Sequence, residues 1–161
     1  MDTIKIKVRK EVVRCDKCKK AKAFLYLSDF SYGQRLIFLN NGKEYAFVNL
    51  IEDNFFAKYT ETVENLLKEN GVKYTSKIVN DFVDKTYGIT CDKINGNIVD
   101  LSIDQKKCFY CGSTEFERNM IEPETLIEIE VSLISHNKWE RLSKNEQKKL
   151  IENKLKEKGI F

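Results

Sequence analysis

Two copies of the pattern Cys-x-x-Cys constrain this chain more than any other feature of its sequence. They are Cys15/Cys18 and Cys108/Cys111. Each pair places two thiolates at a spacing that a tetrahedral metal ion accepts, and two such pairs supply the four ligands of a zinc site. Gly112 follows the second pair directly, where a metal-binding turn needs a residue that tolerates a positive φ. The sequence therefore predicts one four-cysteine zinc site with ligands Cys15, Cys18, Cys108 and Cys111.

Two other uses of the cysteines fit the sequence less well. Disulfides would leave one of the five cysteines unpaired, and the start of the chain alternates charged with apolar residues where a secretion signal has an apolar core. A reducing, cytoplasmic location is therefore expected. A redox-active dithiol requires one Cys-x-x-Cys at the start of a helix, whereas this chain has two copies that together offer a complete ligand set.

The two motifs resemble the knuckles of the zinc-ribbon and rubredoxin-like class, in which two hairpin turns each donate two cysteines. The resemblance covers only the residues around the motifs, and it implies a structural zinc ion and nothing further about activity or partners. Residues 19–107 separate the two pairs, a much longer interval than in a compact ribbon. A metal ion would therefore close a long loop. In principle a cross-link stabilises the folded chain most when the loop that it closes is long.

Size and composition favour one folded domain. A chain of 161 residues with 42% apolar side chains can bury a hydrophobic core, so we expect a single domain over residues 1–161. No segment approaches the roughly 18 uninterrupted apolar residues that a membrane helix needs. Insertion into a membrane is therefore not expected.

Alternating apolar and polar residues predict an antiparallel sheet. Strands are expected at 4–9, 23–27, 35–39, 44–51, 89–94, 97–101 and 126–134. Turns are expected around Ser31–Gly33 and at Asn41-Gly42, a pair that suits a tight hairpin. Lys5 and Lys7 lie on one face of the first strand, and acidic residues lie on one face of the last. If these two strands pair, their charges meet across the sheet.

Helical spacing appears in three places. Apolar residues recur at intervals of three and four after Glu52, which predicts a helix that ends at Asn70-Gly71. A shorter helix is expected from Ser76 to just before Gly88. Ser143 begins a capping box for a last helix that starts near Lys144. The predicted fold class is α+β: an antiparallel sheet with an inserted helical pair, a C-terminal helix and one four-cysteine zinc site.

The sequence offers no catalytic constellation. It contains no phosphate loop, no dinucleotide fingerprint and no nucleophile elbow. Its single histidine, His136, is expected to be a loop residue or a helix cap. Cys91 is expected to be a small buried strand residue. Four cysteines would fill every tetrahedral position and leave no site for water, so the zinc would be structural and the protein no enzyme.

A protein partner is the preferred mode of action, as for an adaptor, an inhibitor or an immunity-type factor. Four aromatic residues lie in expected turns and are candidate anchors for such a partner: Phe30, Tyr32, Phe109 and Tyr110. The alternative is a nucleic-acid-binding protein without sequence preference, in the manner of a zinc ribbon. Its contacts would come from Arg14, Lys17, Lys19, Lys20, Lys148 and Lys149.

A competing explanation exists for the lysines around the first cysteine pair. Four thiolates around a divalent ion carry a net charge of minus two, which neighbouring ammonium groups offset. The net charge of the whole chain, +3, is modest and does not by itself indicate binding to nucleic acid.

Overall fold

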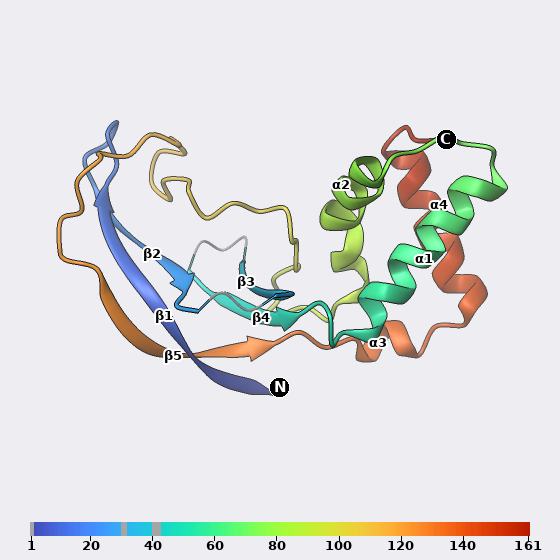
Figure 1. Ribbon diagram of the computed structural model, residues 1–161, viewed down its shortest axis with the longest axis horizontal. Coiled ribbons are helices and arrows are strands. Elements are labelled where there is room, and N and C mark those ends of the chain that lie inside the picture. Colours follow the sequence, from blue (N-terminus) through green and yellow to red (C-terminus); the bar gives the residue numbers. More distant parts are fainter. Residues whose placement is uncertain (1, 30–31, 40–42) are drawn as a thin grey trace. The chain divides into compact units, whose positions relative to one another are not determined.

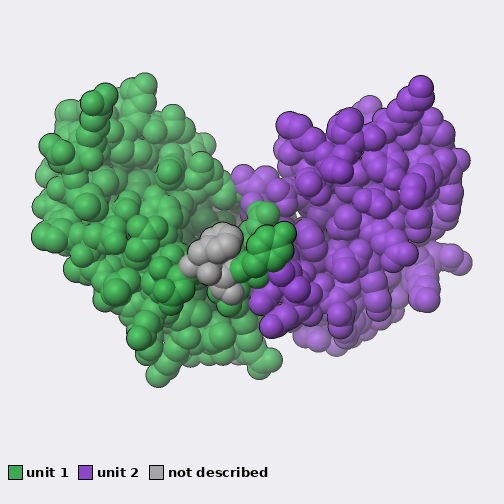
Figure 2. All heavy atoms as spheres, viewed as in Figure 1, with its two compact units in different colours: residues 1–48, 103–133 green, residues 49–102, 134–161 purple. Residues whose placement is uncertain are grey.

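The computed structural model describes residues 2–29, 32–39 and 43–161. The chain divides into two compact units, residues 1–48 with 103–133 and residues 49–102 with 134–161 (Figure 2). The first unit contains the sheet and the second contains the helices (Figure 1). The single domain of residues 1–161 that the sequence predicts stays a prediction.

Five strands form a mixed sheet in the first unit. They are β1 (Thr3–Arg14), β2 (Ala21–Leu27), β3 (Gln34–Phe38), β4 (Tyr45–Asn49) and β5 (Thr125–Leu133), in the order β2-β1-β5-β4-β3. β1 is antiparallel to β2 and β5, whereas β4 and β5 are parallel, so the prediction of a purely antiparallel sheet is wrong. The chain passes into the second unit after each of these two strands.

The pairing of β1 with β5 confirms the expected meeting of opposite charges. Lys5 lies opposite Glu130, and Lys7 lies opposite Glu128. Thr3 Oγ1 also donates a hydrogen bond of 2.6 Å to Glu130. On the other face of the same two strands the isoleucines and valines meet, so one register satisfies both faces.

The sheet of the first unit curls until its two edge strands meet. Lys22 of β2 places its Nζ 4.8 Å from the ring centroid of Phe38 of β3. The side-chain amide of Gln105 pairs with the backbone of Leu25 in β2, with Nε2 donating to the carbonyl at 2.8 Å and Oε1 accepting from the N–H at 3.2 Å. Gln105 thus covers part of β2's outer edge.

The core of this unit includes Val8, Phe24, Ile37, Leu39, Phe47 and Val131.

The helices of the second unit follow the predicted periodicity. They are α1 (Asn54–Glu69), α2 (Ser76–Thr86), the 3-10 turn η1 (Tyr87–Thr90), α3 (Asn137–Glu140) and α4 (Lys144–Glu157). The capping box is confirmed, because Ser143 Oγ accepts a bond of 3.1 Å from the Glu146 N–H. α1 buries Tyr59, Val63, Leu66 and Leu67, as its spacing predicts. Two large apolar side chains of these helices, Ile78 of α2 and Leu150 of α4, are exposed.

The strands predicted at 89–94 and 97–101 do not form. Residues 87–90 make the 3-10 turn η1, and only an isolated bridge joins Ile94 to Asn97 around the expected turn. Ile94 and Val99 are buried nonetheless. A short alternating segment indicates that its apolar residues are buried, but it does not by itself determine a β-ladder. Tyr32 and Gly33 of the turn expected around Ser31–Gly33 lie in a turn, whereas Ser31 and the expected hairpin turn at Asn41-Gly42 lie outside the described residues.

A close approach of two backbone segments in this region makes Gly88 sensitive to substitution. A Cβ added at Gly88 would lie 1.7 Å from the carbonyl oxygen of Val99, and no side-chain rotation could relieve that overlap. We expect Gly88→Ala to lower the free energy of unfolding by about 3 kcal/mol or more. Urea unfolding followed through the fluorescence of Trp139, the single tryptophan of the chain, measures this loss.

Gly96→Ala is the matched control for Gly88→Ala. Gly96 has φ +78°, but its added Cβ would meet nothing within 4 Å. Its substitution should therefore cost only about 1 kcal/mol, the penalty of a positive φ. Equal losses in the two variants would contradict the backbone contact at Gly88.

Candidate metal centre

Both cysteine pairs sit on the same type of turn. In the first knuckle, residues 15–20, the N–H of Lys19 bonds to the carbonyl of Cys15 at 2.9 Å. In the second, residues 108–113, the N–H of Gly112 bonds to the carbonyl of Cys108 at the same distance. Each knuckle is closed by a further backbone bond, from Cys15 to Lys20 at 2.9 Å and from Cys108 to Ser113 at 2.7 Å. The two cysteine pairs therefore share the same local backbone hydrogen bonding.

The residue after each pair has a positive φ. Gly112 has φ +74°, as its position predicts, and Lys19 occupies the equivalent place with φ +63°. A lysine is unusual in this conformation. Its ammonium group lies 3.3 Å from Asp16 and 3.4 Å from Glu117, so it also ties the first knuckle to the segment after the second. The positive φ at Lys19 could not be predicted from the sequence, because only a glycine signals it directly.

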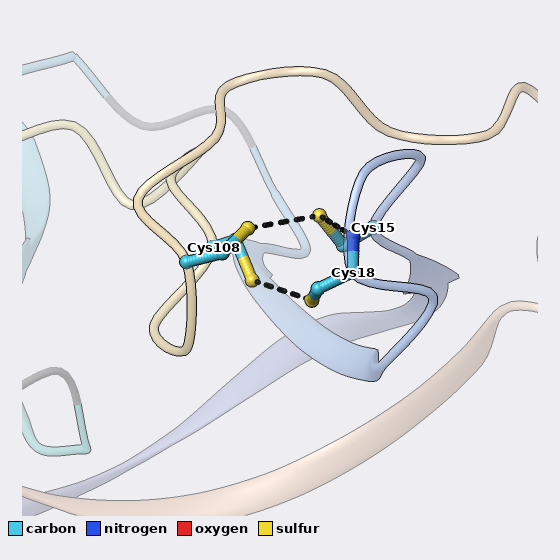
Figure 3. A group of neighbouring side chains, drawn as sticks. Cys15, Cys18 and Cys108 are labelled. Carbon is cyan, nitrogen blue, oxygen red and sulfur yellow. Dashed lines mark hydrogen bonds between the residues drawn. The ribbon is translucent and has the colours of Figure 1, made fainter.

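The structure brings the sulfur atoms of all four predicted ligands together. Cys15 and Cys111 Sγ are 3.6 Å apart, as are Cys18 and Cys108 Sγ, and all four atoms lie within 4.8 Å of one another. Four sulfurs at about 2.3 Å from a tetrahedral zinc ion would be separated by about 3.8 Å. Figure 3 shows the sulfur atoms of Cys15, Cys18 and Cys108 directed toward one another. The four cysteines are thus positioned to bind a metal ion.

Backbone N–H groups of the turns favour ionised sulfur at the first cysteine of each pair. The N–H of Cys18 lowers the pKa of Cys15. Burial raises the pKa of Cys108, but the N–H groups of Cys111 and Tyr110 outweigh it and lower this pKa to about 6. For Cys18 the N–H of Lys20 lowers the pKa, whereas burial and the neighbouring cysteines raise it to about 11. Crowded thiols of this kind ionise together only around a cation.

Hydrogen bonds fasten the second knuckle and its flanking residues to β1 and β2. The N–H of Asp16 bonds to Glu115 at 3.0 Å, and the N–H of Glu117 bonds to Arg14 at 2.9 Å. Lys22 donates from Nζ to the carbonyls of Gln105 at 3.0 Å and Lys107 at 2.8 Å. The site therefore joins segments that are distant in sequence within the first unit.

The predicted nucleic-acid contacts have several partners inside the protein. Arg14 Nη1 donates to the carbonyl of Lys19 at 2.8 Å. The ammonium group of Lys20 lies 4.2 Å from the centroid of the Tyr110 ring. In the second unit Lys148 pairs with Glu69 of α1 at 3.1 Å. Arg14, Lys20 and Lys148 therefore each make a contact within the protein, and the charge of Lys148 is paired with a carboxylate.

Two aromatic side chains project from between the ligands of the second knuckle. Phe109 is 51% exposed and Tyr110 is 60% exposed, with ring centroids 5.8 Å apart in a T-shaped arrangement. Tyr32, the other described candidate anchor, is 77% exposed. Phe30 lies outside the described residues.

His136 lies in the second unit and is a buried partner of an aspartate. Only 8% of its surface is exposed, and its ring stacks on Phe55 with centroids 4.4 Å apart. Nε2 lies 2.8 Å from Asp53 Oδ2, and Nδ1 lies 2.9 Å from the carbonyl oxygen of Thr90. Both ring nitrogens therefore face acceptors, which favours protonation at both positions. Tyr87 also donates to Asp53 Oδ2, at 2.5 Å.

The pKa shifts agree with an ion pair at this position. Burial opposes the charge of His136, but the hydrogen bond with Asp53 and the neighbouring Cys91 raise its pKa to about 10. Burial likewise opposes the charge of Asp53, but the bonds from His136 and Tyr87 lower its pKa. His136 precedes α3, as expected of a cap, yet its side chain makes no capping bond.

Cys91 is not the buried strand residue that the sequence predicts. It follows η1 and is partly exposed, with Sγ 3.7 Å from Thr90 Oγ1 and 3.9 Å from the carbonyl of Tyr87. The strand is absent because residues 87–90 turn instead of extending. Cys91 lies in the other unit from the four clustered cysteines.

A groove of about 780 Å³ opens among α1, α3 and α4 of the second unit. Tyr59 and Trp139 supply apolar surface, and Lys58, Glu61 and Glu140 supply charges of both signs. This mixed lining indicates no particular class of ligand.

Comparisons with protein-family models, with curated proteins and with solved structures found no match. Among the helices of the described residues, none combines the length and the apolar character that crossing a membrane requires.

Proposed function

We propose that the chain is a small non-enzymatic zinc protein that acts by binding another protein, as an adaptor, an inhibitor or an immunity-type factor does. The observation that carries the zinc assignment is the cluster of four sulfur atoms within 4.8 Å of one another. Cysteine sulfur is a preferred ligand of zinc, and four thiolates complete its tetrahedral coordination. Such an ion has no open position for water, so its role is structural.

The exposed aromatics of the second knuckle support a binding role. Phe109 and Tyr110 are held between two ligands, so their backbone is fixed before any partner arrives. Rigid aromatic side chains give a large contact area at a small cost in conformational entropy, and they are frequent at the centres of protein interfaces. Zinc would thus act indirectly, by holding the contact surface in one shape.

Elemental analysis of protein purified without an affinity tag tests the zinc assignment. We expect one zinc ion per chain, bound by Cys15, Cys18, Cys108 and Cys111. Protein that folds with no metal would overturn the assignment and return the two cysteine pairs to redox chemistry.

The double variant Phe109→Ser, Tyr110→Ser tests the interaction surface. Both side chains are exposed, so the variant should keep its zinc and its thermal stability. The variant and the unchanged chain are immobilised separately and exposed to the same protein mixture. The variant should fail to retain a protein partner that the unchanged chain retains. Identical sets of retained proteins would show that this surface is not the contact site.

Binding to nucleic acid without sequence preference is the second candidate. It is favoured by the pairing of Lys20 with the exposed Tyr110 ring, because exposed aromatics beside basic groups suit stacking on single strands. The acidic partners of Lys19 and Lys148 weigh against it. Retention on a nucleic-acid column at low salt, lost steeply as salt rises, would favour this candidate over a protein partner.

A further inference from the structure

One long edge of β5 has no partner strand in the described part of the chain. β5 runs from Thr125 to Leu133 and pairs with β1 along one edge at residues 125–132. On its other edge it pairs with β4 only at Ser132 and Leu133. The described residues therefore leave the outer edge of Thr125–Val131 open. Figure 1 shows β1 and β5 as a long curved ribbon within the first unit.

The side chains along this edge are exposed to different degrees on the two faces. Leu126 is 68% exposed. Ile127 and Ile129 are half-buried on one face, and Glu128 and Glu130 are exposed on the other. An open strand with alternating aliphatic side chains is a template for another strand, because its unpaired N–H and C=O groups offer hydrogen bonds.

The chain itself shows which pattern fits β5. The strand on its closed edge, β1, sets Ile6 against Ile129 and Val8 against Ile127, while Lys5 and Lys7 face the two glutamates. A strand added at the open edge would meet the same β5 side chains, because each residue of β5 lies between its two neighbours. It would need aliphatic residues on one face and basic or neutral residues on the other.

Charge argues against a second copy of β5 as the occupant. In an antiparallel pair of β5 strands, side chains on the same face oppose each other. In the register that sets residue 129 of the two copies opposite each other, Glu128 of each copy lies against Glu130 of the other, and like charges directly opposite each other destabilise a sheet. The face that carries these carboxylates instead suits lysine or arginine.

We propose that the open edge of β5 binds an extended segment of a partner protein in which aliphatic and basic residues alternate. The inference rests on the proposed protein-binding function and names the chemistry of one partner segment. Main-chain hydrogen bonds to Thr125–Val131 would provide affinity, and the contacts with Ile127, Ile129, Glu128 and Glu130 would provide specificity.

Two synthetic peptides test this proposal on the zinc-loaded protein. The first has the sequence of Thr3–Arg9, Thr-Ile-Lys-Ile-Lys-Val-Arg, with blocked ends. The second carries glutamate in place of each basic residue. We expect the basic peptide to bind about tenfold more tightly than the acidic one, from two cross-strand charge pairs, when measured by fluorescence anisotropy. In the double variant Glu128→Gln, Glu130→Gln this preference should disappear.

Amide hydrogen exchange locates the bound peptide. The amides of Thr125–Val131 that point away from β1 should become protected, while those of β1 stay protected. Equal affinity for the two peptides, protection elsewhere, or loss of protection in β1 would overturn the proposal, as would a dimer that already occupies this edge. If these peptide tests fail but a protein partner still requires Phe109 and Tyr110, the proposed protein-binding function would stand without the β5 site.

Discussion

Cys108→Ser is expected to abolish zinc binding and to unfold the first unit. A serine hydroxyl does not replace the thiolate as a zinc ligand, and the free energy of metal binding at such sites is also free energy of folding. Cys108 is buried at the cluster, opposite Cys18 Sγ at 3.6 Å. Without the ion, the remaining cysteines return to the thiol form and no longer hold the two knuckles together.

The expected loss is large because the site closes a long loop. Residues 19–107 lie between the two cysteine pairs, and the bonds of Asp16 and Glu117 across the site depend on that closure. We expect the melting transition of the first unit to disappear or to fall by at least about 10 °C, measured by differential scanning calorimetry with zinc content determined on the same samples.

Cys91→Ser is the matched control, because it makes the same chemical change outside the cluster. Cys91 is partly exposed and contacts no other cysteine in the described residues. Its replacement should leave the zinc content unchanged and cost about 1 kcal/mol of unfolding free energy. If Cys91→Ser and Cys108→Ser lowered the melting temperature equally, the four-cysteine assignment would be wrong.

Features set by neighbouring residues could be predicted from the sequence. Each cysteine pair is recognised from its Cys-x-x-Cys spacing, and α4 begins at Lys144 because Ser143 and Glu146 form a local cap. The pairing of β1 with β5 is a longer-range case, for which the sequence supports only a conditional prediction: if these strands pair, their charges meet. The strands do pair, and the alternating lysines and glutamates lie opposite one another.

Features set by distant segments could not be predicted. The parallel pairing of β4 with β5 joins segments that are far apart in the chain, and no local pattern records it. The buried network of Asp53, Tyr87 and His136 joins three segments of the chain. Asp53 suits the start of α1 on sequence grounds, and His136 suits a loop, so neither residue signals the other.

Asp53→Asn should destabilise the second unit by about 3 kcal/mol or more at pH 6, since it leaves the imidazolium of His136 buried without its counter-ion. Asparagine caps helices as well as aspartate does, so bonds from the N–H groups of Phe55 and Phe56 can persist. The substitution therefore tests the charge and not the cap. Trp139 is buried in the same unit, and its fluorescence during urea unfolding reports the loss.

The pH dependence of this loss follows from the direction of each shift. The pKa of His136 rises from its ordinary 6.5 to about 10, so the stability that its charge contributes is complete below pH 6.5 and is lost as pH rises through 10. The pKa of Asp53 is lowered, so its contribution is present above its ordinary 3.8 and is lost as pH falls below that value. The pair should therefore stabilise the protein most between about pH 4 and 6.5.

A double-mutant cycle of Asp53→Asn with His136→Gln separates the pair from every other titrating group. Lysines, tyrosines and cysteines change with pH in all four proteins, and their effects cancel in the coupling energy. We expect that coupling to be largest at pH 6 and to shrink at pH 8 and again at pH 10. A coupling that stayed constant over this range would mean that His136 is neutral in the folded protein. A neutral imidazole carries an N–H on only one ring nitrogen. Nε2 lies 2.8 Å from a carboxylate and Nδ1 lies 2.9 Å from a carbonyl, so a neutral His136 would leave one of these two acceptors without an N–H. For this reason we expect the charged form.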